Sequence, residues 1–415
     1  MTEVRPIRVL LDAMIAGEGA AGGVEQFVIG LASGLRSVAP ADIDFTFIGY
    51  EDALDWLGPY VEPHRLRISH RPRFGPAKAW LAGRLPVLRS AKDLLRPGHL
   101  APAAARIGAL EADVIHFTHQ RAFLTPIPSL YQPHDLQHRH LPEMFSEADA
   151  RGRETLYREF CTRAALVVTP TSWVRDDVIA AYPVLPERVA VVPYAPAPDR
   201  QELSSQDDLR RIELDLGLPH RFALYPAQTW PHKNHEGLMR AAALLKTQGR
   251  TVPLVFSGHV SKEARVRLPA LARQLGISDE VKILGFVDPK VLAALYRLAH
   301  CVVVPSLFEG WCFPIWEAFK IGVPVACSDI ESLPQRVRDC AVRFDPRSGS
   351  SMAAAIVRVS DDVRLRQELV ECGRALANEF TGERSTRLLV AHYRRIGGAH
   401  LDEEDRSLLA APPLI

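Results

Sequence analysis

The sequence predicts two doubly wound α/β domains that face each other across a cleft, and three observations predict this fold class. The chain has 415 residues, about twice the length of a typical single domain. Short apolar, β-branched runs alternate with helical periodicity almost from end to end, which is typical of parallel strands joined by helical crossovers. A stretch rich in Pro, Ser and charge at residues 193–208 interrupts this pattern and has the composition of an interdomain linker.

The first half of the pattern predicts a Rossmann-like domain over residues 1–198. Its first strand is expected at residues 7–15. Behind the following glycine loop, the apolar spacing predicts one face of a helix, formed by Val24, Phe27, Val28, Leu31 and Leu35. Further strands are expected at IDFTFIGY, DVIHFT, ALVVTPTS and RVAVVPY.

The second half predicts a similar domain over residues 208–379. The alternation restarts at RFALYPAQ, and PLVFSGH, EVKILGF, HCVVVPS and VPVACSD are the later strand candidates. Residues 397–415 are polar and then end on a Pro-containing run, so we expect a frayed tail there.

Composition excludes several classes of protein. A net charge of +1 argues against a nucleic-acid partner, because duplex-binding domains usually carry a strong basic excess. No stretch approaches about 18 uninterrupted apolar residues, so no membrane-spanning helix is expected. The first apolar run is broken by Asp12, which argues against a secretory signal. The six cysteines form no CxxC pair, which favours a reducing, cytoplasmic location.

Segment 64–106 departs from the average composition. It carries ten Arg or Lys residues against a single acid, Asp93, with Trp80 and several leucines between them. A basic amphipathic segment can lie on an anionic membrane surface or hold an acidic acceptor. The alternative is a solvated helix with an apolar stripe toward the core.

The first loop, GEGAAG, places Gly17, Gly19 and Gly22 at GxGxxG spacing, with Glu51 near the end of the next strand. This layout resembles a dinucleotide fingerprint, but the glycines begin late after the strand. A weaker prediction follows: Gly22 and Gly23 let the backbone approach a phosphate at a helix N-terminus.

The run PHDLQHRH places His134, His138 and His140 beside Asp135. A metal site would usually add an H-E-x-x-H motif or a cysteine pair, and neither accompanies these residues, so no metal is expected. His134 follows a strand, where ligand sites of α/β domains lie, and we expect it to hydrogen-bond a ligand hydroxyl. The other two are interpreted as surface histidines.

At the start of the second domain, AQTWPHKNHEGL places Gln228, Lys233 and Asn234 between a strand and a helix. A lysine there can neutralise a phosphate that the helix N-terminus also attracts. The alternative is that Asn234 caps the helix and Lys233 is merely solvated.

The stretch PSLFEGWCFPIWEAF combines two glutamates with five aromatic residues. Pro314 suits the first turn of a helix, so Glu309 is expected in a strand-to-helix loop and Glu317 in the first turn. A carboxylate beside fixed backbone amides suits a ligand that carries both vicinal hydroxyls and phosphate. A glycosidase with two catalytic carboxylates is the alternative, but the companion motifs are phosphate cradles.

Residues 281–330, with the E-x7-E pair Glu309 and Glu317, resemble the signature region of retaining glycosyltransferases of family 4, the group 1 type with the GT-B fold. The runs GGVEQFV, HDLQH and HKNHEGLMRAA extend the similarity over most of the chain. The resemblance implies an acceptor-binding N-terminal domain and a C-terminal domain that binds a nucleotide-diphosphate sugar. It also implies metal-independent transfer, no cofactor, and a final helix at 380–396 that crosses back to the first domain.

The resemblance also implies a role for each matching residue. His134, Lys233 and Glu309 would act on the transferred hexose and the diphosphate, and Glu317 would bind the ribose hydroxyls. The remaining donor-binding positions would be Gly22, Gly23, Gln228, Phe286, Val287, Gly310, Trp311, Cys312 and Phe313. Of these, Phe286 and Val287 would contact the nucleobase.

Two positions depart from the family pattern. Gln228 stands where the family often has Arg, and Cys312 replaces a frequent glycine. The expected activity is transfer of a hexose, as in mannosyltransferases, from a GDP- or UDP-linked donor to a lipid-linked or cell-surface glycan precursor, with peripheral contact to the inner face of the membrane. A nucleotide-sugar epimerase of the same architecture and a non-catalytic GT-B-like subunit are the alternatives.

Overall fold

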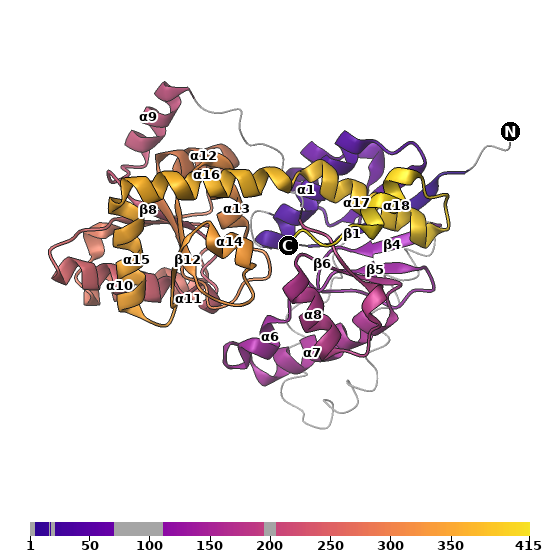
Figure 1. Ribbon diagram of the computed structural model, residues 1–415, viewed down its shortest axis with the longest axis horizontal. Coiled ribbons are helices and arrows are strands. Elements are labelled where there is room, and N and C mark those ends of the chain that lie inside the picture. Colours follow the sequence, from indigo (N-terminus) through magenta and orange to yellow (C-terminus); the bar gives the residue numbers. More distant parts are fainter. Residues whose placement is uncertain (1–4, 16, 18–20, 70–110, 195–204) are drawn as a thin grey trace.

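The computed structural model describes residues 5–15, 17, 21–69, 111–194 and 205–415. Two α/β bodies lie beside each other and a long helical segment near the C-terminus joins them (Figure 1). Every strand pair in the two sheets is parallel, which confirms the predicted fold class. Most of the basic segment 64–106 lies outside the described residues.

The N-terminal sheet has seven strands in the order β3-β2-β1-β4-β5-β6-β7. Their bounds are β1 (Ile7–Ala13), β2 (Ile43–Gly49), β3 (Leu66–Ile68), β4 (Val114–Phe117), β5 (Ser129–Tyr131), β6 (Leu166–Thr169) and β7 (Val189–Val191). The order reverses between β1 and β4, and such a switch point opens a crevice at the carboxyl ends of the strands. The predicted strands at 7–15 and in the four later runs are confirmed.

Helices cover both faces of this sheet, as expected for parallel strands. They are α1 (Gly23–Val38), α2 (Ala53–Trp56), α6 (Gln137–His140), α7 (Glu147–Arg163) and α8 (Ser172–Ala181). The apolar stripe predicted for α1 is turned inward, because four of its five members are fully buried and Val24 packs against the same core. Short single turns lie at Gly58–Tyr60, Pro63–Arg65, Pro142–Met144 and Pro186–Arg188.

The C-terminal sheet has six strands in the order β10-β9-β8-β11-β12-β13. They are β8 (Ala223–Pro226), β9 (Leu254–Ser257), β10 (Val281–Gly285), β11 (Cys301–Val304), β12 (Val325–Ser328) and β13 (Val342–Phe344). The helices are α9 (Gln206–Asp215), α10 (His235–Thr247), α11 (Lys262–Gln274), α12 (Pro289–Leu298), α13 (Phe313–Ile321), α14 (Gln335–Asp339), α15 (Gly349–Asp361) and α16 (Val363–Glu379). Single turns lie at Pro231–Lys233 and Ser278–Glu280.

The chain returns to the N-terminal domain through α17 (Gly382–Gly397), which packs against α1 (Figure 1). Arg394 on this helix forms two bonds of 2.8 Å with the carboxylate of Asp42, and a third of 2.8 Å with Asp405. Bidentate Arg–carboxylate pairs are among the stronger polar contacts. The predicted crossing of 380–396 back onto the first domain is therefore confirmed.

The structure differs from the frayed tail expected at 397–415. Residues Glu403–Ala410 form α18, and Asp402 and Asp405 close its N-terminus with a reciprocal capping box. The chain then runs back toward the domain boundary, where the Ile415 carbonyl accepts hydrogen bonds from the backbone and hydroxyl of Ser172. The acidic run that suggested solvation is the first turn of a helix, where negative charge is stabilising.

Cys340 and Cys372 form a disulfide that joins the end of α14 to α16. The remaining four cysteines are buried and unbonded. The reducing, cytoplasmic location expected from the cysteine pattern does not predict this bond. The two residues are 32 positions apart, and only the packing of the helices brings them together. Among the residues that the structure describes, no helix is both long and apolar enough to cross a membrane.

Candidate active site

The site is built at the carboxyl ends of the strands of both sheets, and its centre is an ion pair. The ammonium nitrogen of Lys233 lies 2.6 Å from a carboxylate oxygen of Glu309. Both side chains are largely withdrawn from water, with 18% and 8% of their surfaces exposed. Burial lowers the pKa of Lys233, but the charge of Glu309 and other attractions outweigh it, so the net pKa is raised and the lysine is charged.

Lys233 is held by the turn that connects β8 to α10. The next residue, Asn234, adopts a left-handed conformation and accepts a hydrogen bond from the Gly237 amide, so it caps α10. Its own amide group donates to the carbonyls of Pro305 and Pro346 at 3.0 and 2.9 Å. Asn234 thus caps the helix, as the alternative interpretation of the sequence expected. Lys233 is paired with Glu309 rather than merely solvated.

Glu309 lies in the loop between β11 and α13, as the sequence predicts. Its backbone amide donates to the Ser332 hydroxyl at 3.3 Å. The same loop is tied to β8 through Tyr225, whose hydroxyl contacts Ser306 at 2.9 Å and the Lys233 carbonyl at 3.0 Å. These contacts fix the loop and the lysine turn relative to each other.

In this loop Cys312 stands where the family resemblance expects a glycine. It has φ +65°, in the left-handed region that favours glycine, and it precedes α13 without a side-chain cap. Burial, and next the charge of Glu309, raise the pKa of its thiol well above the usual range, so it stays protonated. Pro314 has no backbone N–H and the Ile315 amide donates to the Cys312 carbonyl at 3.1 Å, so Phe313 supplies the amide that the start of α13 can offer a ligand anion.

The aromatic rings of the loop pack against one another rather than facing solvent. Trp311 and Trp316 stack with centroids 4.7 Å apart, and the Trp316 indole donates to the Trp311 carbonyl at 3.1 Å. Phe380, at the start of the crossover, covers Trp316 at 4.9 Å. The rings thus hold the loop in place.

Glu317 lies on α13 in a different environment from Glu309. Its carboxylate accepts a hydrogen bond of 2.6 Å from the Tyr296 hydroxyl on α12. Its predicted ribose contact remains a prediction. The tyrosine fixes the direction of the carboxylate.

The N-terminal domain presents His134 to the same loop. His134 has φ +67°, and a Cβ added to Gly310 would lie 3.0 Å from the His134 carbonyl oxygen. The Nε2 atom of the ring lies 2.9 Å from the Thr118 carbonyl, and the Nδ1 atom lies 2.6 Å from the Tyr194 hydroxyl. Because a carbonyl only accepts, Nε2 carries the proton and Nδ1 accepts from the tyrosine. Burial lowers the pKa of His134 to about 3, so the ring is neutral.

This geometry differs from the expected hydrogen bond between the His134 ring and a ligand hydroxyl. Both ring nitrogens are occupied by protein groups, and the backbone carbonyl is the atom that lies next to Gly310. The neighbouring Asp135, whose carboxylate accepts from the Gln137 amide, also approaches Gly310. Sequence reasoning missed both Asp135 and Tyr194 as parts of the site.

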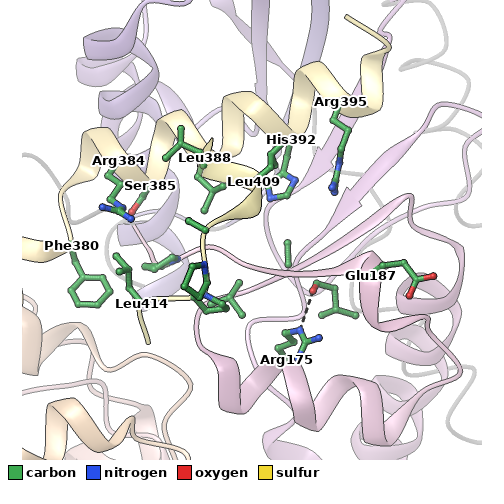
Figure 2. A pocket seen from close by; sticks show the side chains of 18 of the residues that line it. Arg175, Glu187, Phe380, Arg384, Ser385, Leu388, His392, Arg395, Leu409 and Leu414 are labelled. Carbon is green, nitrogen blue, oxygen red and sulfur yellow. Dashed lines mark hydrogen bonds between the residues drawn. The ribbon is translucent and has the colours of Figure 1, made fainter. Parts of the chain in front are cut away.

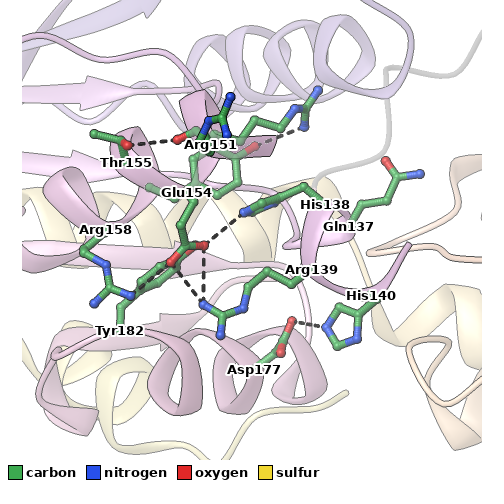
Figure 3. Close-up of polar contacts among 12 residues, drawn as sticks. Gln137, His138, Arg139, His140, Arg151, Glu154, Thr155, Arg158, Asp177 and Tyr182 are labelled. Atoms are coloured by element: carbon green, nitrogen blue, oxygen red, sulfur yellow. Dashed lines mark hydrogen bonds and ion pairs between the residues drawn. The ribbon is translucent and has the colours of Figure 1, made fainter. Parts of the chain in front are cut away.

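The remaining histidines of the PHDLQHRH run pair with carboxylates of neighbouring helices (Figure 3). His138 lies 3.3 Å from Glu154 and His140 lies 2.8 Å from Asp177. Glu154 also accepts from Arg158 and Tyr182. His138 is buried rather than on the surface, which corrects the sequence interpretation. The described part of the chain contains no cluster of His, Cys, Asp and Glu arranged to hold a metal ion.

The glycines at the start of α1 lie against the C-terminal domain. Gly22, with φ +56°, packs on the side chain of Gln228, and Gly23 packs on the ring of Phe313. Helix α1 starts without a side-chain cap, as α13 does. The structure therefore brings two helix N-termini that lack a side-chain cap to the contact between the two domains, on the loops that follow β8 and β11 in the C-terminal domain. Gly17 packs instead on Trp56, and Gly19 lies outside the described residues.

Two aromatic rings stand exposed at this edge of the C-terminal sheet. Phe286, which follows β10, is 52% exposed, and Trp230, which follows β8, is 56% exposed. The loops that carry them are joined through the loop after β9, because the Thr229 amide donates to His259 and the Gly258 amide donates to Gly285. Val287 is partly buried beside Phe286. Sequence reasoning missed Trp230, although its place directly after a strand signals it.

A cavity of about 230 Å³ lies elsewhere, between β7, α17 and the tail that follows α18 (Figure 2). Its wall includes Arg175, Glu187, Arg384, His392 and Arg395. None of the residues predicted for the donor or the catalytic site lines it. The cavity is thus separate from the cleft.

Comparison with known proteins agrees with this geometry. Residues 209–376 match the family described as Glycosyl transferases group 1, and residues 21–199 match Glycosyltransferase Family 4. The O-antigen chain mannosyltransferase B of Escherichia coli is 29% identical over 278 residues, covering 64% of this chain and 73% of that protein. A D-inositol 3-phosphate glycosyltransferase of Salinispora arenicola is 27% identical over 409 residues, covering 91% of this chain and 88% of that protein.

Solved structures show the same fold at low sequence identity. Anabaena HepE, in complex with UDP and glucose, superimposes with a TM-score of 0.69 at 18% identity, covering 94% of this chain and 100% of that one. WaaG, a glycosyltransferase involved in lipopolysaccharide biosynthesis, superimposes with a TM-score of 0.68 at 15% identity, covering 95% and 100%. At these identities the likeness establishes the two-domain architecture alone.

Proposed function

Because the chain belongs to the family 4, group 1 glycosyltransferases of the GT-B fold, we propose that it transfers a hexose from a nucleotide-diphosphate donor to an acceptor held by the N-terminal domain. The transfer retains the anomeric configuration. The protein itself needs no cofactor or metal in this proposal, since the nucleotide sugar is a co-substrate.

The observation that carries the proposal is the buried pair of Lys233 and Glu309, together with two helix N-termini that lack a side-chain cap at the contact between the two domains. Cleavage of the donor leaves negative charge on a diphosphate. A lysine and fixed backbone amides stabilise that charge where it develops, without reorganising during the reaction. The carboxylate of Glu309 accepts hydrogen bonds from sugar hydroxyls once the lysine turns to the phosphate.

The donor lies along the C-terminal domain in this proposal. Glu317 takes the ribose hydroxyls, and Phe286 with Val287 takes the nucleobase. The amides from Gly310 to Phe313 face the sugar and the diphosphate, while Gly22, Gly23 and Gln228 close over the phosphates from the other side. The exposed ring of Trp230 adds an apolar wall at the same edge.

The hexose and the acceptor are proposed from the relatives. One relative is named a mannosyltransferase of the O-antigen chain, and HepE holds UDP and glucose. A GDP- or UDP-linked hexose is therefore the donor, and a lipid-linked or cell-surface glycan precursor is the acceptor. The basic composition of segment 64–106 supports peripheral contact with the anionic inner face of a membrane.

Incubation with labelled UDP-glucose and GDP-mannose, with and without a crude lipid-linked glycan fraction, tests the proposal. We expect label to pass to the acceptor with wild-type protein and not with Glu309→Gln. Glu263→Gln, which changes an exposed glutamate on α11, serves as the matched control and should transfer normally. Conversion of the donor without an acceptor would instead identify an epimerase, and binding without any turnover would identify a non-catalytic subunit.

A further inference from the structure

Tyr194 joins the two sides of the cleft. It lies just after β7, is 4% exposed, and its hydroxyl is 2.6 Å from the Nδ1 atom of His134. Its ring stacks on Phe313 with centroids 5.9 Å apart, and contacts Trp311 at 5.6 Å. The side chain of Tyr194 therefore bonds His134 of the N-terminal domain and packs on the loop of the C-terminal domain that carries Glu309.

His134 occupies a backbone conformation that its surroundings must enforce. A non-glycine residue at φ +67° is disfavoured and persists only when neighbouring contacts hold it. The contacts here are those of the ring: the Thr118 carbonyl accepts a hydrogen bond from Nε2–H, and the Tyr194 hydroxyl donates to Nδ1. With both nitrogens bonded, the imidazole anchors the turn that places the His134 carbonyl beside Gly310.

We propose that Tyr194 is a positioning residue for the transfer reaction. Its hydroxyl holds the His134 imidazole in one tautomer and orientation. Because its ring packs on Phe313, this hydrogen bond also depends on the contact between the Phe313 loop and the N-terminal domain. The inference rests on the proposed function, because the His134 turn borders the place assigned to the hexose. Tyr194 is assigned no step of the reaction, since its side chain is buried and its hydroxyl is bonded to His134.

The packing of the ring supports the second half of the proposal. Phe313 and Trp311 of the C-terminal domain form one wall of the buried setting of Tyr194. Without that wall, water would compete for the hydroxyl and for Nδ1, and the bond would weaken. The proposal therefore makes the order of the His134 turn depend on the loop that carries Phe313.

Tyr194→Phe is the test, because it removes the hydroxyl and keeps the stacked ring. We expect kcat to fall about tenfold while the donor KM stays within about twofold of the wild type, since the hydroxyl orders the site without touching the donor. Nitrogen NMR of histidine-labelled protein, with His134→Gln for assignment, gives a second readout. The wild type should show a protonated Nε2 and a hydrogen-bonded Nδ1, and the variant an Nδ1 signal shifted toward an unbonded nitrogen.

Tyr393→Phe is the control, because the Tyr393 hydroxyl bonds the ring of another histidine, His116, at 2.7 Å in a similarly buried setting, and Tyr393 lies on the crossover helix α17. The Tyr393→Phe variant should have a lower free energy of unfolding than the wild type but the same kcat. The proposal is overturned if Tyr194→Phe keeps kcat within twofold, if Tyr393→Phe lowers it equally, or if the His134 signal does not move. A wild type that transfers no sugar would instead refute the proposed function, and the NMR comparison would still decide whether Tyr194 holds the imidazole.

Discussion

Lys233 and Glu309 form a 2.6 Å ion pair in a setting where less than a fifth of either side chain is exposed. Removing two charges from water is costly, and their mutual attraction offsets this cost only while both partners are present. The family resemblance assigns the lysine to the diphosphate and the glutamate to the sugar. In the proposed function the donor separates this pair, because the lysine turns to the diphosphate and the glutamate to the sugar.

Replacement of one partner should destabilise the fold more than replacement of both. Lys233→Met leaves a buried carboxylate without a counter-charge and should lower the free energy of unfolding by about 3 kcal/mol. The double variant Lys233→Met with Glu309→Leu should recover part of that loss. Urea unfolding measures both, and a single variant as stable as the wild type would show that the pair is fully solvated in solution.

Gly310 is expected to be required for closure of the cleft. A Cβ at this position would lie 3.0 Å from the His134 carbonyl oxygen and 3.1 Å from the Asp135 side chain, so the His134 turn or the Gly310 loop must give way slightly. Gly310→Ala should therefore lower kcat/KM for the donor about tenfold, as expected for small misplacements in a site.

Gly349→Ala is the matched control for this variant. Gly349 begins α15, has ordinary backbone angles, and an added Cβ meets nothing within 4 Å. Its activity should equal that of the wild type. Equal activity of Gly310→Ala and the wild type would contradict the close approach of the two domains.

Acid should destabilise the protein through His116. This residue is fully buried between Tyr393 and Gln132, and burial lowers its pKa from 6.5 to about 4. Below about pH 6.5 His116 is protonated in the unfolded chain, whereas in the folded protein it stays neutral down to about pH 4. Stability therefore falls as the pH falls through this window. The group should account for about 2 kcal/mol between pH 7 and pH 5.

The variant His116→Gln replaces the imidazole with a side-chain amide, which does not titrate. Urea unfolding of both proteins at pH 7 and pH 5 measures the difference. The variant should lose about 2 kcal/mol less than the wild type over this interval, whatever its stability at pH 7. Parallel losses would mean that the ring is reached by water.

The crossover helix should depend on Arg394. Arg394→Met breaks the bidentate pair with Asp42 and leaves the Asp405 carboxylate, 4% exposed, without its cation. The free energy of unfolding should fall by at least about 1 kcal/mol. Arg364→Met on α16 is the control, because its pair with Glu368 is open to solvent and should contribute less than about 0.5 kcal/mol. Equal losses would contradict the importance of the crossover contact.

Local sequence patterns predicted the fold and the position of the Glu309 loop. The stripe on α1 and the strand HCVVVPS before the Glu309 loop follow from local pattern, which acts over a few residues. Long-range pairing is beyond such patterns. The partners Arg394 and Asp42 are 352 positions apart, and the partners Tyr194 and His134 are 60 apart. Only packing brings them together, and for the same reason the sequence did not reveal that both nitrogens of His134 are bonded.

The tail and the histidines illustrate a second limit. A charged run such as that at 402–405 is compatible with solvent and with a capped helix, and the choice depends on Arg394 of the preceding helix. His138 likewise looks like a surface residue in sequence, but it is buried and bonds Glu154 of α7, which lies at the edge of the interior with 33% of its side chain exposed. In both cases the partner, rather than the residue itself, decides the structure.

The central claim is that the cleft around Lys233 binds a nucleotide-diphosphate sugar, and calorimetric titration tests it most directly. Wild-type protein is titrated with UDP, GDP, UDP-glucose and GDP-mannose, and the binding member is then titrated into Lys233→Met. We predict that at least one binds with a stoichiometry of one, and that the variant binds it at least about tenfold more weakly because the diphosphate loses its cation. Absence of binding by all four, or equal affinity of the variant, would contradict the account.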